Sequence, residues 1–127
     1  MSAIELRGID HVVLRVRDLD AALRFYSSVL GCAIERRVDD IGLIQLRAGT
    51  NLIDLVPLAS PLGRAGGAGP GNEGRNVDHF ALSVAHFDET ALRAHLVAHG
   101  VEPGDVAERY GAEGMGPSMY IRDPDGN

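Results

Sequence analysis

Two stretches of sequence decide the fold: residues 9–16 read IDHVVLRV, and residues 77–84 read VDHFALSV. Each begins with an apolar residue and an Asp-His pair, which places His11 and His79 at matching positions. β-Branched and apolar residues dominate both stretches, and this predicts a strand at residues 9–16 and another at residues 79–84. Imidazole is the commonest metal ligand in proteins. A repeat that duplicates a histidine is therefore the best guide to function in this chain.

The rest of the chain continues the repeat. An aspartate-led helix that ends at a glycine is predicted after each copy, with Asp18 or Asp20 as the first cap and Gly31 and Gly100 as the two ends. Alternating apolar residues predict three further strands in the first copy, at residues 33–38, 42–47 and 51–56. The second copy predicts strands at residues 106–109 and 118–122, a flexible crossing at 111–116 and a turn at 123–127.

This order predicts an α+β domain of two tandem βαβββ modules that form a cup-shaped mixed sheet. Module one covers about residues 7–57, and module two covers about residues 76–127. A glycine-rich joint at about residues 58–75 is predicted to be a mobile loop, because its glycines do not stand between a strand and a helix as a phosphate loop requires. By symmetry we expect the last strand of module two to lie beyond residue 127.

Length, charge and cysteine content limit the function classes. The 127 residues make one domain, and the net charge of −6 provides no basic surface for nucleic acid or for a membrane. We find no signal core and no membrane-spanning run. The single cysteine, Cys32, excludes an internal disulfide and indicates the cytoplasm. We interpret it as a small buried apolar residue.

Three residues are candidate metal ligands. A pseudo-two-fold relation between the modules would bring His11 and His79 to one place. Asp54 is an acid within the apolar strand at 51–56, where a carboxylate is costly unless it is paired, exposed or bound to a cation. Two imidazoles and a carboxylate suit Zn, Ni, Co, Mn or Fe(II). The alternatives are histidines that bond to the backbone and an aspartate that faces solvent.

Other polar residues receive weaker interpretations. Gln45 and Tyr120 occupy nearly equivalent third-strand positions, so each either contacts substrate or lies in the core. His95 and His99 have the i, i+4 spacing of metal ligands on a helix, but they also fit an ordinary helix surface, as does His86. No residue is assigned a catalytic role.

The chain resembles the vicinal oxygen chelate superfamily, which includes glyoxalase I, extradiol dioxygenases, fosfomycin resistance proteins and bleomycin-binding proteins. The resemblance covers nearly the whole chain, and the chain is most similar to the small glyoxalase-domain-containing branch. The motifs that carry it are GIDHVVL at 8–14, ALRFYSSVLG at 22–31, DHFAL at 78–82 and YIRDPDGN at 120–127.

This resemblance implies a divalent metal at His11, Asp54 and His79, plus a glutamate three residues after Asn127 and outside the chain. Asp54 stands where the family usually has glutamate. The implied function is a metal-dependent lyase, isomerase or dioxygenase that acts on a small molecule with vicinal oxygens. The alternatives are a metal-free drug- or metabolite-binding protein of the bleomycin-resistance type, or a structural member without a ligand. A homodimer is also implied, while the substrate and the identity of the metal stay open.

Overall fold

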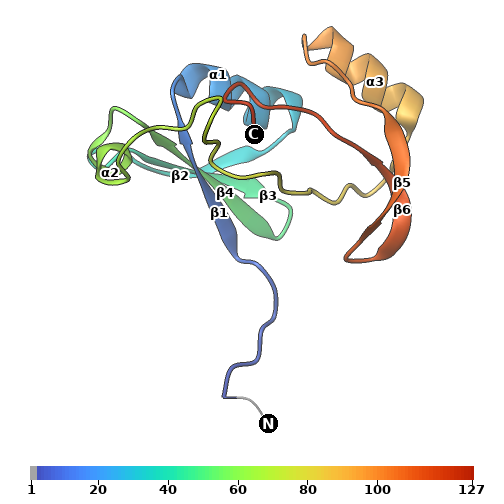
Figure 1. Cartoon of the computed structure of the whole chain (residues 1–127), viewed down its shortest axis with the longest axis horizontal. Helices are drawn as coiled ribbons and strands as arrows, with labels where there is room; N and C mark the ends of the chain where they lie inside the picture. Colours follow the sequence, from blue (N-terminus) through green and yellow to red (C-terminus); the bar gives the residue numbers. More distant parts are fainter. Residues whose placement is uncertain (1–2) are drawn as a thin grey trace. The chain divides into compact units, whose positions relative to one another are not determined.

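The computed structural model describes residues 3–127 and divides the chain into two compact units, which meet in sequence at residues 76 and 77. Unit one contains β1 (His11–Val16), α1 (Leu19–Leu23), the π-helical turn η1 (Arg24–Val29), β2 (Ala33–Val38), β3 (Leu43–Ala48), β4 (Asn51–Pro57) and α2 (Pro61–Ala65). Unit two contains α3 (Glu89–Ala98), β5 (Val106–Gly111) and β6 (Gly114–Met119) (Figure 1).

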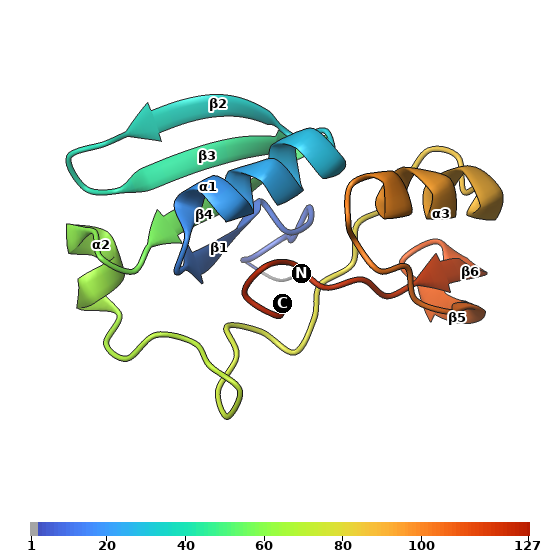
Figure 2. The same cartoon turned by 90° about the horizontal axis from the view of Figure 1, so that it is seen from above.

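Unit one is built on a four-stranded sheet with the order β1-β4-β3-β2. β1 pairs with β4 in parallel, and the other neighbours are antiparallel. Because side chains alternate along a strand, every second residue faces the helix α1, which lies against this sheet (Figure 2). The predicted α+β class is therefore confirmed. The core side chains on this face are Leu14, Val16, Ile44, Leu46, Ile53 and Leu55, with Ala22, Phe25 and Tyr26 from the helix.

The opposite face of the same sheet carries polar residues. The strand register places Val13, Asp54 and Gln45 in one row across β1, β4 and β3. The next row contains His11 and Arg47 on either side of Leu52. The sheet is thus amphipathic, and its polar face brings three of the predicted site residues, His11, Asp54 and Gln45, onto neighbouring strands.

The helices of the two units begin in the same way. In unit one the carboxylate of Asp18, the first of the two predicted caps, accepts a hydrogen bond of 3.1 Å from the backbone N–H of Ala21. In unit two Asp88 accepts an equivalent bond of 3.1 Å from the N–H of Ala91 at the start of α3. Each cap satisfies a donor that the helix itself leaves unpaired. The repeat therefore encodes its helix starts locally.

The strand predicted at residues 79–84 does not form, and this prediction was wrong. In unit one the equivalent residues are a strand because β4 pairs with them along their length. In the described part of unit two, β5 and β6 pair with each other and no third strand offers residues 79–84 a partner. A strand needs a neighbouring ladder of hydrogen bonds, so the segment keeps an irregular backbone.

The strands of unit two also differ from the prediction. β5 and β6 form an antiparallel hairpin in which Gly111 pairs with Gly114. The glycines at 111–116 were predicted to make a flexible crossing, but they belong to the hairpin and its two-residue turn. Gly114 has a φ of +97°, a conformation that a residue with a side chain rarely adopts. The same glycine pattern can thus mark a tight turn instead of a flexible segment.

The segment at residues 58–75 is not the free loop that the sequence predicts. It begins with the short helix α2, which is capped by Ser60. The side chains of Arg15 and Arg17 then donate hydrogen bonds of 2.6–3.0 Å to backbone carbonyls within residues 67–70. A Cβ at Gly66 would lie 2.6 Å from a guanidinium nitrogen of Arg15, so a side chain there would displace the guanidinium. Two arginines therefore hold the glycine-rich segment next to β1.

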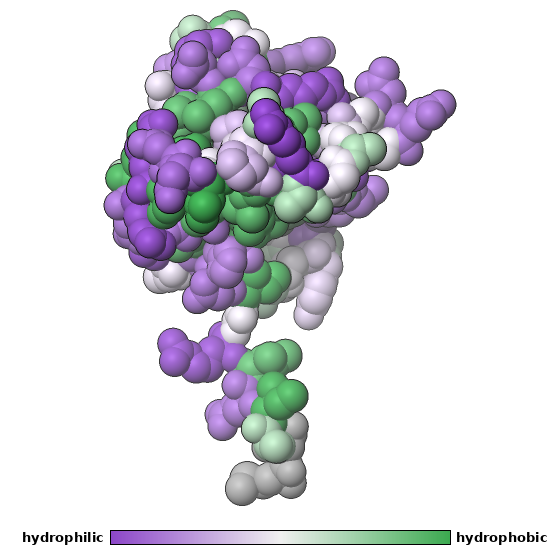
Figure 3. Space-filling view, turned by 90° about the vertical axis from the view of Figure 1, so that its left-hand side faces the viewer, coloured by the Kyte–Doolittle hydropathy of each residue, from purple (hydrophilic) through white to green (hydrophobic). Residues whose placement is uncertain are grey.

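Two further features of unit one are an N-terminal arm and a buried cysteine. Residues 3–10 form an arm before β1 (Figure 3). Ile4, Leu6 and Ile9 on this arm are exposed. Cys32 is buried, as predicted, and this burial raises the pKa of its thiol.

None of the helices in residues 3–127 combines the length and the apolar run that a bilayer-spanning segment needs.

Candidate metal centre

Each repeated Asp-His pair forms the same side-chain contact. The Nδ1 atom of His11 lies 2.7 Å from a carboxylate oxygen of Asp10, and Nδ1 of His79 lies 2.6 Å from one of Asp78. An ionised carboxylate only accepts hydrogen bonds, so Nδ1 carries a proton, and in the neutral ring Nε2 keeps its lone pair. Histidines that bind metals are usually oriented by such a bond on the other ring nitrogen. Both imidazoles are therefore in the tautomer that a metal ligand requires.

The environment of His11 adds a second acidic neighbour. The hydrogen bond to Asp10 raises the pKa of His11 above its ordinary value, and the nearby Asp54 carboxylate raises this pKa further. His11 and Asp54 lie on the same face of adjacent strands, with His11 opposite Leu52 and Asp54 two residues further along β4. This pair of side chains is thus placed to share a cation.

Asp54 is the most deeply buried acid among the described residues, with 3% of its surface exposed. Its two carboxylate oxygens accept hydrogen bonds of 3.3 and 3.2 Å from the side-chain amide of Gln45. The oxygen of that amide in turn accepts a bond of 3.4 Å from Arg36. Gln45, predicted to contact substrate or lie in the core, therefore holds a candidate ligand in place.

A second buried aspartate provides a comparison. Asp123 is 7% exposed and accepts bonds of 2.8–2.9 Å from two backbone N–H groups, of Asp125 and Asn127, and from the Asn127 side chain. Its carboxylate is thus satisfied by the turn that it closes. Asp54 receives bonds from one neutral amide, which offsets less of the cost of burying a charge. This difference favours Asp54 over Asp123 as a group that binds a cation.

In unit two, Tyr120 is the neighbour of His79. Its hydroxyl lies 3.4 Å from Nε2 of His79, and the two ring centres are 5.2 Å apart. The Arg109 guanidinium stacks over the tyrosine ring at 4.8 Å from its centre. Tyr120 remains half exposed, so its hydroxyl faces both the histidine and the solvent.

The predicted site residues thus form two sets: His11, Asp54 and Gln45 in unit one, and His79 and Tyr120 in unit two. Within either unit, residues 3–127 contain no cluster of three or more His, Cys, Asp or Glu side chains that could hold a metal ion. Sequence reasoning missed Asp10 and Asp78 as orienting groups, although the repeated Asp before each His could have identified them. Arg36 and Arg109 have no comparable signal in the sequence.

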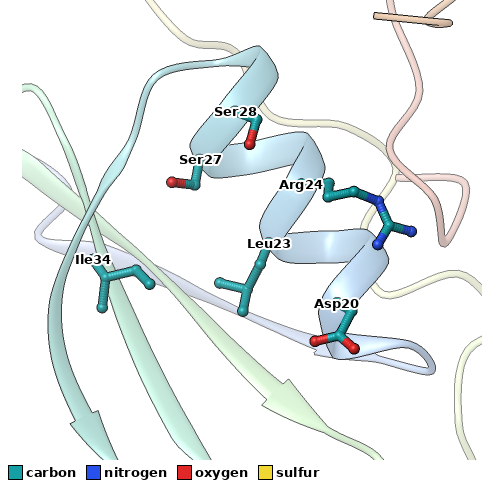
Figure 4. A pocket seen from close by; sticks show the side chains of 6 residues that line it. All are labelled: Asp20, Leu23, Arg24, Ser27, Ser28 and Ile34. Atoms are coloured by element: carbon teal, nitrogen blue, oxygen red, sulfur yellow. The ribbon is translucent and has the colours of Figure 1, made fainter.

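Unit one also has a shallow hollow of about 320 Å³ beside α1, η1 and β2 (Figure 4). It lies next to the helices that cover the apolar face of the sheet, whereas Asp54 lies on the polar face. The hollow is open and contains none of the candidate ligands, so we assign no function to it. Its lining residues are Asp20, Leu23, Arg24, Ser27, Ser28 and Ile34.

Similar proteins share both the sequence pattern and the fold. Residues 8–127 match the family model of the Glyoxalase/Bleomycin resistance protein/Dioxygenase superfamily. The chain is 32% identical over 124 residues to the Virulence protein STM3117 of Salmonella typhimurium, over 94% of this chain and 78% of that protein. The crystal structure of STM3117 is similar with a TM-score of 0.76 and 26% identity, over 98% of this chain and 94% of that chain.

Two similar proteins carry the names of enzymes. Catechol-2,3-dioxygenase of Bacillus subtilis is 26% identical over 120 residues, which is 94% of this chain but 39% of that protein. A lactoylglutathione lyase from Agrobacterium tumefaciens has a similar structure, with a TM-score of 0.58 and 24% identity over 97% of this chain and 90% of that chain. The second likeness is one of fold alone.

Proposed function

We propose that this chain, which belongs to the Glyoxalase/Bleomycin resistance protein/Dioxygenase superfamily, is a metal-dependent enzyme that acts on a small molecule with two adjacent oxygen atoms. The proposed ligands are His11, Asp54 and His79. When bound, a divalent ion supplies a Lewis acid for the two substrate oxygens. Zn, Ni, Co, Mn and Fe(II) all suit two imidazoles and a carboxylate. The reaction is of the lyase, isomerase or dioxygenase type.

The observation that carries this proposal is the pair of oriented imidazoles. Asp10 and Asp78 each accept the Nδ1 proton of the following histidine, at 2.7 and 2.6 Å. About half of each imidazole side chain is exposed, so neither ring is enclosed by the protein. A surface histidine without a function is not expected to form the same Asp-His hydrogen bond at the equivalent position of a second unit. The duplication therefore supports a ligand role for both.

The buried carboxylate of Asp54 supports the third ligand. A charge at 3% exposure is costly unless a cation or several donors compensate it. The side-chain amide of Gln45, which donates to both carboxylate oxygens of Asp54, is neutral. Gln45 thus acts as a positioning residue for Asp54, and the half-exposed hydroxyl of Tyr120 is the group we expect to contact the substrate. A homodimer also remains our prediction for the assembly.

One observation favours a second candidate, a metal-free protein that binds a drug or a metabolite. The Tyr120 hydroxyl already lies 3.4 Å from Nε2 of His79, so this nitrogen has a neighbour without any ion. Metal binding at His79 would require Tyr120 to move or to bind the ion's water. Metal content therefore separates the two candidates.

The test is elemental analysis of purified protein after removal and reloading of divalent ions. We expect about one ion per chain whose binding depends on these three residues, with an affinity at least about tenfold lower in His11→Ala, Asp54→Ala and His79→Ala. His86→Ala, which changes an exposed histidine outside the candidate site, is the matched control. Equal metal affinity in all five proteins would rule out the ligand assignment, and absence of any bound ion would favour the binding protein.

The loaded protein then distinguishes the reaction types. Oxygen uptake with a catechol would identify a dioxygenase, whereas loss of a glutathione hemithioacetal without oxygen uptake would identify the lyase type. Either activity should fall together with metal content in the His11→Ala variant. An activity that stays unchanged in the metal-free protein would contradict the proposed mechanism.

A further inference from the structure

The C-terminal end of α3 carries two imidazoles that the proposed function does not use, one in the last turn and one on the C-cap residue, His99. His95 and His99 are four residues apart, so they lie on the same face of the helix. Their ring centres are 4.4 Å apart and their planes are inclined by 42°. Both residues are exposed. The sequence alone leaves this spacing ambiguous, but the rings do lie together, which an ordinary pair of surface side chains need not do.

The tautomer of His99 is set by the backbone. Its Nδ1 atom lies 2.9 Å from the carbonyl oxygen of His95. A carbonyl oxygen only accepts, so Nδ1 donates the hydrogen bond and Nε2 keeps its lone pair. The same logic applies to His11 and His79, where a carboxylate takes the place of the carbonyl. His99 is therefore oriented as metal-binding histidines usually are.

The distance between the rings fits a chelate. Metal–nitrogen distances are about 2.0–2.1 Å, so two imidazoles that bind one ion have ring centres about 4.5 Å apart at a right angle and about 5.2 Å apart at the tetrahedral angle. The observed 4.4 Å is close to the first of these values. Helical zinc sites of the HExxH type use the same i, i+4 histidine pair. Here Leu96 stands where that motif has its glutamate base, and it is buried, so the pair can bind an ion but brings no base for hydrolysis.

We propose that His95 and His99 form a second metal site, which binds a divalent transition ion of the Cu²⁺, Ni²⁺ or Zn²⁺ class through two nitrogens and completes the coordination shell with water. Imidazole selects these ions over Mg²⁺ and Ca²⁺, which prefer oxygen ligands. The site is at the C-terminal end of α3, where the helix dipole favours a positive charge. It uses none of the ligands of the proposed enzyme centre, so it stands independently of that proposal.

The experiment is Ni²⁺ titration by calorimetry in a His11→Ala/His79→Ala background, which removes two ligands of the proposed centre. We expect about one Ni²⁺ per chain in this background, and at least about tenfold weaker binding after His95→Gln or His99→Gln. His86→Gln, at another exposed histidine, should leave the affinity unchanged. If both glutamine variants bind Ni²⁺ as tightly as the background does, the proposal is overturned. It is also overturned if only one of the two variants binds Ni²⁺ more weakly, because that would indicate a single ligand.

A second measurement locates the ion. Substoichiometric Cu²⁺ should first broaden the amide signals of the last turn of α3 and of residues 100–101 in the NMR spectrum, while Mg²⁺ should broaden none. Broadening centred on His86 instead would overturn the proposal. If wild type and the His11→Ala/His79→Ala background bind the same number of ions, the enzyme centre fails while this site is retained, so the two failures are distinguishable.

Discussion

Unit one and unit two carry the same sequence motif, which forms strand β1 in unit one and no strand in unit two. The locally determined features agree: each unit has an Asp-His contact and an aspartate that caps its helix. The strand differs because β4 pairs with β1, whereas no such neighbour is described for residues 79–84. Capping is therefore a property of the motif, and strand formation is a property of the motif together with its partner.

The largest expected effect contrasts equivalent leucines of the two copies. Leu14 on β1 is 0% exposed, and its counterpart Leu82 is 45% exposed. Leu14→Ala leaves a cavity in the core, so we expect it to lower the free energy of unfolding by about 2–5 kcal/mol. Leu82→Ala should cost less than about 1 kcal/mol. Urea unfolding measures both, and an equal cost would show that residues 77–84 are packed like β1.

The second prediction contrasts the two buried aspartates. Asp54→Asn removes a charge but keeps an oxygen, so we expect about 10–100-fold weaker metal binding with little loss of stability. Asp123→Asn is the matched control, because its carboxylate closes a turn. It should lower the free energy of unfolding by about 1–3 kcal/mol and leave metal affinity unchanged. Calorimetric metal titration and urea unfolding of both variants test this, and the reverse pattern would exchange the two roles.

The third prediction concerns the feature that the units share. Asp18→Ala and Asp88→Ala each remove a helix cap bond of 3.1 Å. Each should therefore cost about 1 kcal/mol of unfolding free energy. Circular dichroism during urea unfolding measures the effect, and Asp20→Ala, at a residue that makes no cap, should cost less. A cost in one unit alone would show that the caps are not equivalent.

The sequence is sufficient to predict the features that depend on neighbours along the chain. Both helix starts, the strands β2 to β4 and the burial of Cys32 follow from alternation, capping and turn residues. The α+β class follows from their order. The prediction of a strand at 79–84 was wrong because the motif does not include the neighbouring strand with which it would have to pair. The loop predicted at 58–75 differs from the structure because it contains the helix α2, and its carbonyls accept hydrogen bonds from Arg15 of β1 and from Arg17, which follows β1.

The candidate site shows the same division. The sequence suggests His11 and His79 from symmetry, because the repeat marks equivalent positions, and Asp54 because it is an acid within an apolar strand. It does not show that Gln45 donates to Asp54 or that Tyr120 approaches His79, since both contacts depend on strand register and side-chain orientation. The repeated aspartate before each histidine, Asp10 and Asp78, is visible in the sequence. That each aspartate orients the following imidazole is known only from the geometry of the Nδ1 hydrogen bond.

The smallest effect tests whether the Asp-His contact persists in solution. The bonded carboxylate of Asp10 stabilises the charged imidazolium of His11, so the pKa of His11 lies above the ordinary value of 6.5. Asp10→Asn should lower it, while Asp39→Asn, whose carboxylate pairs with Arg37 instead, should not. NMR titration of the His11 ring protons in metal-free protein measures this pKa. Since a protonated imidazole cannot bind an ion, acid should displace the metal from wild type at a higher pH than from Asp10→Asn. An unchanged pKa in Asp10→Asn would mean that the aspartate does not hold the ring, and the tautomer argument for His11 would fail with it.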